Sequence, residues 1–189
     1  DDADGEPSAG ASAADEIMID RAIQAAQDLP AVESCRSLAG AAPPGVAAQL
    51  VSRDEALAVS IAQARGDFQL GRTEGLAQLV AVLAERADER VDAALRARAH
   101  LLLGRIRADA GEFDVADASL RQAAARAVEA GDASLAATAW LTRIDTLSAS
   151  PSHHEDALAM LPRVERAVEH AGNSPRLRAR LLATTGQML

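Results

Sequence analysis

Apolar residues recur along most of the chain with the spacing of one face of an α-helix. Leu95, Ala99, Leu102 and Ile106 stand at i, i+4, i+7 and i+11, which places them on one side of a helix. Three further stripes have helical spacing: Phe113, Ala116, Leu120, Ala123 and Ala127; Trp140, Ile144 and Leu147; Ala157, Leu161, Val164 and Val168. Because alanine favours helices and strand-forming residues are scarce, the sequence predicts an all-α fold.

Capping residues and glycines predict where these helices begin and end. Side chains that can accept hydrogen bonds from the first free amides predict helix starts near Ser52, Thr73, Asp92, Asp114, Asp132, Ser152 and Ser174. Glycines suited to a left-handed residue predict helix ends before Gly71, Gly111, Gly131 and Gly172, and the helix that starts at Thr73 ends near Ala87. Pro162 lies inside one helix and should kink it, although the apolar stripe continues on both sides.

The first 51 residues have a different character from the rest of the chain. Residues 1–14 are acidic and rich in Gly, Ser and Ala, so we expect a disordered segment. A helix is expected over about 15–28, and Pro30 blocks its continuation. Residues 30–46 contain three prolines and two glycines, which predicts a connector. We therefore expect an N-terminal helix and connector over 15–51 and a helical array over 52–189.

A 41-residue period runs through the predicted array. Gly104 and Gly186 are separated by two such steps, and Ala116 recurs one step later as Ala157. Leu120 recurs as Leu161 in the same way. A period of this length is typical of an array of helix pairs in which each repeat packs on its neighbours. Such an array offers an extended surface rather than a single catalytic cleft.

The residues that repeat resemble the tetratricopeptide repeat. Leu103-Gly104, Gly111, Phe113, Ala116, Leu120 and Ala123 stand as in that family, where a small residue of the first helix packs against an alanine of the second. The resemblance implies a right-handed superhelical array of antiparallel helix pairs, about three and a half repeats long. The period exceeds the standard 34, Leu76 replaces the small residue of the second helix in the first repeat, and Asp145 replaces that of the first helix in the third.

A narrower resemblance includes residues upstream of the array. Asp20-Arg21-Ala22-Ile23, Leu29-Pro30, Cys35 and Pro43-Pro44, followed by long repeats, are similar to the C-terminal sensor region of serine/threonine protein kinases from myxobacteria. The resemblance implies a regulatory, non-catalytic part of a kinase, in a cytoplasmic location or as a region of a larger signalling protein. No phosphate-binding loop, lysine or Asp-Phe-Gly triplet is present. A transcription regulator or a signal-transduction ATPase with a helical-repeat sensor remains the alternative parent.

Composition narrows the possible partners. The 19 basic residues are all arginine, and the net charge of −9 argues against binding to nucleic acid or to an anionic membrane. The sequence has no run of about 18 apolar residues, the length that would predict a membrane span. The single cysteine, Cys35, excludes an internal disulfide and is expected to be a small buried apolar residue. The chain begins without methionine, so we expect a fragment of a longer protein.

No catalytic, cofactor or metal site emerges from the sequence. His153-His154-Glu155-Asp156 is the one cluster with metal-binding residue types, but adjacent histidines on a helix point about 100° apart. We therefore interpret this cluster as a solvated helix start, with its acids favoured by the helix dipole. His100 and His170 are expected at the surface or at the edge of a groove.

Arginines on the first helices are the candidate binding residues. Arg98, Arg105 and Asp109 stand at i, i+7 and i+11 on one helical face, and Arg65 and Arg180 fall at similar places in their repeats. First helices line the concave groove in tetratricopeptide arrays. We therefore predict a groove that binds acidic or C-terminal carboxylate groups of a protein or peptide. The alternative is ordinary solvated charge with local pairing to Glu or Asp.

The last helix should lack a partner from a completed fourth repeat. Four apolar residues of this helix would then need cover: Leu177, Leu181, Leu182 and Leu189. The helix either packs only on the preceding pair or mediates self-association through its exposed face.

Overall fold

The computed structural model describes residues 53–90 and 92–188, with the side chain of Arg53 left out. Within this part of the chain the fold is entirely helical, as the sequence predicts. Seven α-helices and one 3-10 helix follow in order: α3 (Arg53–Gln69), α4 (Leu76–Asp88), α5 (Ala93–Asp109), α6 (Phe113–Glu129), α7 (Ala133–Ser148), η1 (Pro151–His153), α8 (His154–His170) and α9 (Pro175–Met188). The segments predicted over 1–14, 15–28 and 30–46, with Cys35 and Leu189, lie outside the described residues.

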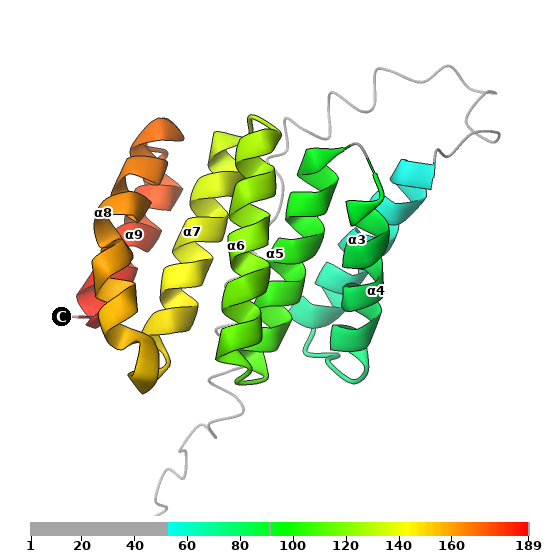
Figure 1. Cartoon of the computed structure of the whole chain (residues 1–189), viewed down its shortest axis with the longest axis horizontal. Coiled ribbons are helices and arrows are strands. Elements are labelled where there is room, and N and C mark those ends of the chain that lie inside the picture. Colours follow the sequence, from blue (N-terminus) through cyan, green and yellow to red (C-terminus); the bar gives the residue numbers. More distant parts are fainter. Residues whose placement is uncertain (1–52, 91, 189) are drawn as a thin grey trace, which may run out of the picture. The chain divides into compact units, whose positions relative to one another are not determined.

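The helices stand side by side, and successive helices pack against one another (Figure 1). Helix α5 packs on α4 and α6, and α7 packs on α6 and α8. A second set of contacts joins alternate helices, α5 with α7 and α7 with α9. Within the described residues, the contacts among α4 to α9 therefore join helices that are near one another in sequence.

Most of the predicted helix ends are confirmed. Four glycines have positive φ, between 69° and 82°: Gly71, Gly111, Gly131 and Gly172. Each stands two residues after the last residue of a helix. The Asp92 carboxylate accepts hydrogen bonds from the amides of Ala94 and Leu95, and the Asp132 carboxylate accepts one from Leu135. Ser174 precedes Pro175 at the start of α9 and accepts a bond of 3.4 Å from the amide of Leu177.

Three predicted capping residues are wrong. Helix α4 begins at Leu76 rather than near Thr73, because Gly75 at φ 66° ends a turn in which the amide of Leu76 bonds the Thr73 carbonyl. Helix α6 already includes Asp114, and Glu112 occupies the position before it without a side-chain cap. At α8 a 3-10 turn precedes the helix, and the Ser152 hydroxyl contacts Ser150 and His153 rather than capping α8.

Most residues of the predicted apolar stripes are buried in the core, whereas Phe113, Trp140 and Leu161 are only partly buried. Leu120, Leu141, Ile144, Val80, Val164 and Val168 are the largest fully buried side chains. One cluster joins α3, α4 and α5, and another joins α7, α8 and α9. Between them, α5, α6 and α7 meet through alanines: Ala97, Ala127 and Ala136 in one group, Ala123, Ala124 and Ala139 in another. Small side chains therefore bring the central helices close together.

Gly104 packs directly against α6. A Cβ atom added to Gly104 would lie 2.5 Å from Cγ of Leu120 and 3.3 Å from the carbonyl oxygen of Ala116. No side chain fits at that distance, so glycine allows α5 and α6 to approach this closely. At Gly186, by contrast, an added Cβ would meet no atom within 4 Å. The two glycines share a place in the sequence period but not in the packing.

Helices α8 and α9 complete the described fold. Helix α8 continues through Pro162, as the apolar stripe predicts. Helix α9 packs on both α7 and α8, and Leu177 is buried there. Leu182 on the same helix is 69% exposed. None of the described helices is long and apolar enough to cross a membrane.

Candidate functional site

The five residues predicted to line a groove lie on three helices. Arg65 is exposed on α3, and Arg98 and Asp109 are exposed on α5. Arg105 on α5 and Arg180 on α9 are partly buried. The guanidinium of Arg105 lies 5.7 Å from the centre of the Phe68 ring of α3, close enough for a cation–π contact.

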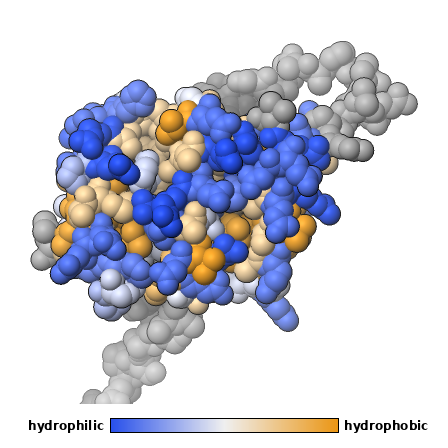
Figure 2. Space-filling model, viewed as in Figure 1, coloured by the Kyte–Doolittle hydropathy of each residue, from blue (hydrophilic) through white to orange (hydrophobic). Residues whose placement is uncertain are grey.

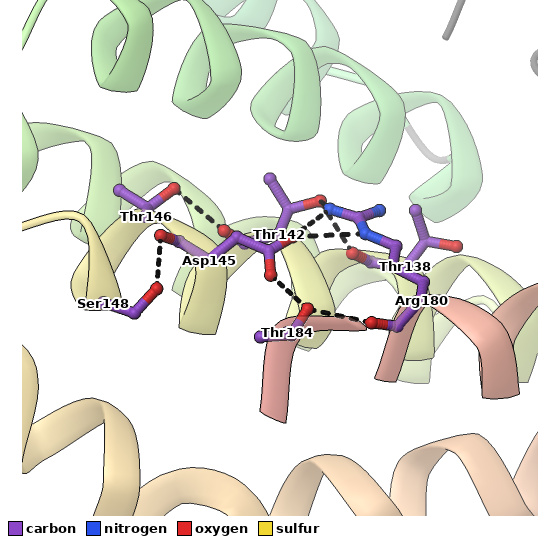
Figure 3. A network of polar contacts seen from close by, with 7 residues as sticks. All are labelled: Thr138, Thr142, Asp145, Thr146, Ser148, Arg180 and Thr184. Carbon is purple, nitrogen blue, oxygen red and sulfur yellow. Dashed lines mark hydrogen bonds and ion pairs between the residues drawn. The ribbon is translucent and has the colours of Figure 1, made fainter. Parts of the chain in front are cut away.

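Arg180 is bound within the chain. Its Nη2 atom donates to Asp145 Oδ2 over 2.7 Å and to Thr142 Oγ1 over 2.9 Å, and its Nε donates to the same Asp145 oxygen over 3.2 Å. Thr184 donates its hydroxyl hydrogen bond to the other oxygen of Asp145. Figure 3 shows these contacts between α7 and α9. Arg180 therefore pairs with a carboxylate of its own chain, which is the alternative to ligand binding that the sequence leaves open.

The threonines of α7 support this network. The hydroxyl of Thr142 donates to the carbonyl of Thr138, and that of Thr146 donates to the carbonyl of Thr142 (Figure 3). A hydroxyl has one hydrogen to donate but can still accept, so Thr142 is oriented to receive the Arg180 guanidinium. Asp145 stands where the repeat pattern has a small residue, and its carboxylate joins α7 to α9 rather than packing like Gly104.

His100 is buried rather than at the surface. Its side chain is 7% exposed, and its Nε2 atom lies 3.1 and 3.0 Å from the two carboxylate oxygens of Asp88. The contact joins α5 to the end of α4. The prediction of a surface or groove-edge position for His100 is wrong, because the turn of α4 towards α5 brings a carboxylate over it. His170 is exposed, as predicted.

The histidine cluster at the start of α8 faces protein groups. His153 Nε2 lies 3.1 Å from Asp114 Oδ1 of α6, and its Nδ1 lies 3.1 Å from the Ser150 and Ser152 hydroxyls. Among residues 53–90 and 92–188, no group of three or more His, Cys, Asp or Glu side chains is placed to hold a metal ion.

The arginines that the structure gathers are not the predicted ones. A depression of about 630 Å³ lies over α6, α7 and α8, and none of the five predicted residues lines it. Figure 2 shows hydrophilic side chains interspersed with apolar ones on the face of the molecule seen in Figure 1. Charged groups on three helices contribute to the lining: Asp117 and Arg121 of α6, Arg143 of α7, and Asp156, Arg163 and Arg166 of α8.

Two arginines of this depression flank one indole. The Arg143 guanidinium lies 5.3 Å and the Arg163 guanidinium 5.2 Å from the ring centre of Trp140. Arg143 also pairs with Asp117, and both side chains are largely buried, at 14% and 15% exposure. Arg121 contacts the other oxygen of Asp117 over 3.1 Å. Sequence reasoning missed this site because its arginines come from helices whose relative placement only the fold decides.

At the opposite ends of α5 and α6, one carboxylate bridges two arginines. Glu129 accepts a hydrogen bond from Arg126 over 3.0 Å and one from Arg96 over 2.7 Å. The bond from Arg126, followed by that from Arg96, holds the pKa of Glu129 below its ordinary value. This contact ties the start of α5 to the end of α6.

Comparisons with protein-family models, curated proteins and solved structures find no match to this chain.

Proposed function

We propose that this chain is a protein-interaction module built of tetratricopeptide-like helix pairs. In this proposal the pairs are antiparallel, stack into a right-handed superhelix and bind a protein or peptide. The observation that carries the proposal is the contact of Gly104 with Leu120 and Ala116. Gly104 and Ala116 are the positions at which the resembled repeats pack a small residue of the first helix against an alanine of the second, and Leu120 is a further position of the resemblance.

The arrangement of contacts supports a binding role over catalysis. Each helix packs on helices near it in sequence, so the array leaves long faces of several helices at the surface. A preformed helical surface loses little ordering entropy when a ligand binds. The residues that carry the resemblance upstream further lead us to propose a regulatory, non-catalytic region of a bacterial serine/threonine protein kinase.

Selection from a displayed peptide library tests the binding role. We expect the immobilised chain to enrich peptides with a common pattern, and a synthetic copy to bind saturably in calorimetry. The matched control is Leu141→Asp, which places a charge at a fully buried position and should unfold the array and abolish enrichment. Enrichment by neither form, or ATP hydrolysis by the purified wild-type chain, would contradict the proposal.

The kinase assignment has its own test. Kinase signatures such as Gly-rich loop, His-Arg-Asp and Asp-Phe-Gly in the coding sequence that flanks this region would support it. A DNA-binding domain or a P-loop ATPase in that position would reject the kinase parent. Neither result tests the proposed interaction role of the helical array, which the peptide selection tests separately.

A further inference from the structure

The depression over α6, α7 and α8 is positively charged on a negatively charged protein. Its lining holds four arginines against two aspartates, while the whole chain has a net charge of −9. The net charge of the residues that line the depression is therefore opposite in sign to the net charge of the whole chain. Local potential in a concave surface is focused by its low-dielectric walls, which favours an anionic ligand at this position.

The four arginines differ in what they contact. Arg143 and Arg121 share Asp117, so that carboxylate is occupied from both sides. Arg163 and Arg166 stand at i and i+3 on α8, and both are exposed. Within the described residues neither of these two has a carboxylate partner. The arginines of the depression that have no carboxylate partner among the described residues are thus on α8.

Trp140 fixes the direction in which one of these arginines can bind. A guanidinium that lies over an indole presents its N–H groups at its edge, where a carboxylate can accept two hydrogen bonds. Arg163 has this relation to Trp140, and Arg143 lies against the same ring. Met160, which is partly exposed, adds apolar surface to the lining. The site therefore combines arginine side chains with some apolar surface.

We propose that this depression binds an acidic segment of a partner protein. A Glu or Asp side chain of the segment pairs with Arg163 and Arg166, and a neighbouring apolar side chain packs on the partly exposed Met160. A volume of about 630 Å³ holds a few residues of a peptide. Asp156 at the same depression has no cationic partner among the described residues and opposes the ligand. The inference rests on the proposed interaction role and names the site and the charge of the partner.

Trp140 provides a reporter at the site, because it is the one tryptophan of the chain and no tyrosine is present. The probe is a synthetic eight-residue peptide of Glu and Leu, and its matched control has Gln in place of Glu. We expect the Glu peptide to change the emission of Trp140 saturably, and the Gln peptide to leave it unchanged. Raising the salt concentration should weaken the binding, since the contacting charges are exposed.

Charge variants locate the binding, with affinity measured by calorimetry. Arg163→Glu and Arg166→Glu should each weaken the Glu peptide about tenfold or more. Asp156→Asn should strengthen it, because a like charge is removed. Arg86→Glu is the matched control, an exposed arginine of α4 outside both the depression and the predicted groove, and should bind as the wild type does.

The outcomes separate this inference from the proposed function. If Arg98→Glu loses binding and Arg163→Glu retains it, the proposed site on α8 is wrong. The acidic ligand would then bind the groove that the sequence predicts around Arg98. Equal binding of the Glu and Gln peptides would overturn the acidic ligand. If neither peptide binds at millimolar concentration, this inference is rejected, and the peptide selection still decides whether the array binds proteins.

Discussion

A Cβ atom at Gly104 would lie 2.5 Å from Cγ of Leu120, a distance that no real side chain tolerates. Gly104→Ala must therefore push α5 and α6 apart or force Leu120 into another rotamer. Overpacking of this kind costs about 1–3 kcal/mol, of which the better helix propensity of alanine returns about 1 kcal/mol. We expect a lower free energy of unfolding for Gly104→Ala in urea denaturation followed by circular dichroism.

Gly186→Ala is the matched control for this substitution. Gly186 also lies inside a helix, but an added Cβ would meet nothing within 4 Å. The substitution should raise stability by about 0.5–1 kcal/mol, the usual gain of alanine over glycine in a helix. Equal effects of the two substitutions would contradict the packing role of Gly104.

Leu120 and Gly104 should also be coupled in a double-mutant cycle. Leu120 is fully buried, so Leu120→Ala should cost about 2–5 kcal/mol alone. In the Leu120→Ala background the space above Gly104 is free, and adding Gly104→Ala should be nearly neutral or stabilising. A coupling free energy of about 1 kcal/mol or more is expected from urea titrations of the four proteins. Additive effects would show that the two residues do not constrain each other.

Asp145 should hold α9 against α7. Asp145→Ala removes the partner of Arg180 and one acceptor of Thr184, at a cost of about 1 kcal/mol after solvent screening of the half-exposed ion pair. Hydrogen exchange followed by mass spectrometry should show that the substitution speeds up exchange in α9 more than in α5, relative to the wild type. Asp156→Ala is the control, because Asp156 is exposed and should leave the exchange of α9 unchanged. Uniformly faster exchange in all helices would contradict a local role.

The carboxylate of Glu129 should titrate below the ordinary range of a glutamate. Its lowered folded-state pKa means that the contribution of this group to stability is present above the pKa of the unfolded chain and is lost as pH falls through the lower pKa of the folded state. Arg126→Gln should raise the pKa of Glu129 in an NMR titration, because it removes the largest cause of the shift. A pKa of Glu129 that does not change between the two proteins would show that Arg126 does not interact with it in solution.

Local chemistry explains which helix starts the sequence predicts correctly. At Asp92 and Asp132 a carboxylate precedes the helix and reaches its first amides, so residue type and position suffice. At Thr73, Asp114 and Ser152 a residue of suitable type is present, but Gly75, Glu112 and His153 stand directly before the helices instead. Backbone geometry over several residues decides these cases, and a single side chain does not reveal it.

The candidate site shows the opposite balance. Arg98 and Arg105 can be assigned to one helical face from their spacing, because 3.6 residues per turn is a local property. Arg143 and Arg163 belong to α7 and α8, and their approach to Trp140 depends on how those helices pack. The pairing of Arg180 with Asp145 similarly needs 35 residues of intervening chain to return to α7.

The helices, most of their apolar faces and the 41-residue period can be predicted from the sequence, because each depends on interactions within a few residues or on direct repetition. Whether equivalent positions of the period make equivalent contacts depends on the packing of the helices. Gly104 meets Leu120, Gly186 meets nothing, and Asp145 between them binds α9. The period places these three residues alike, but the contact that each makes depends on the helix that packs over it.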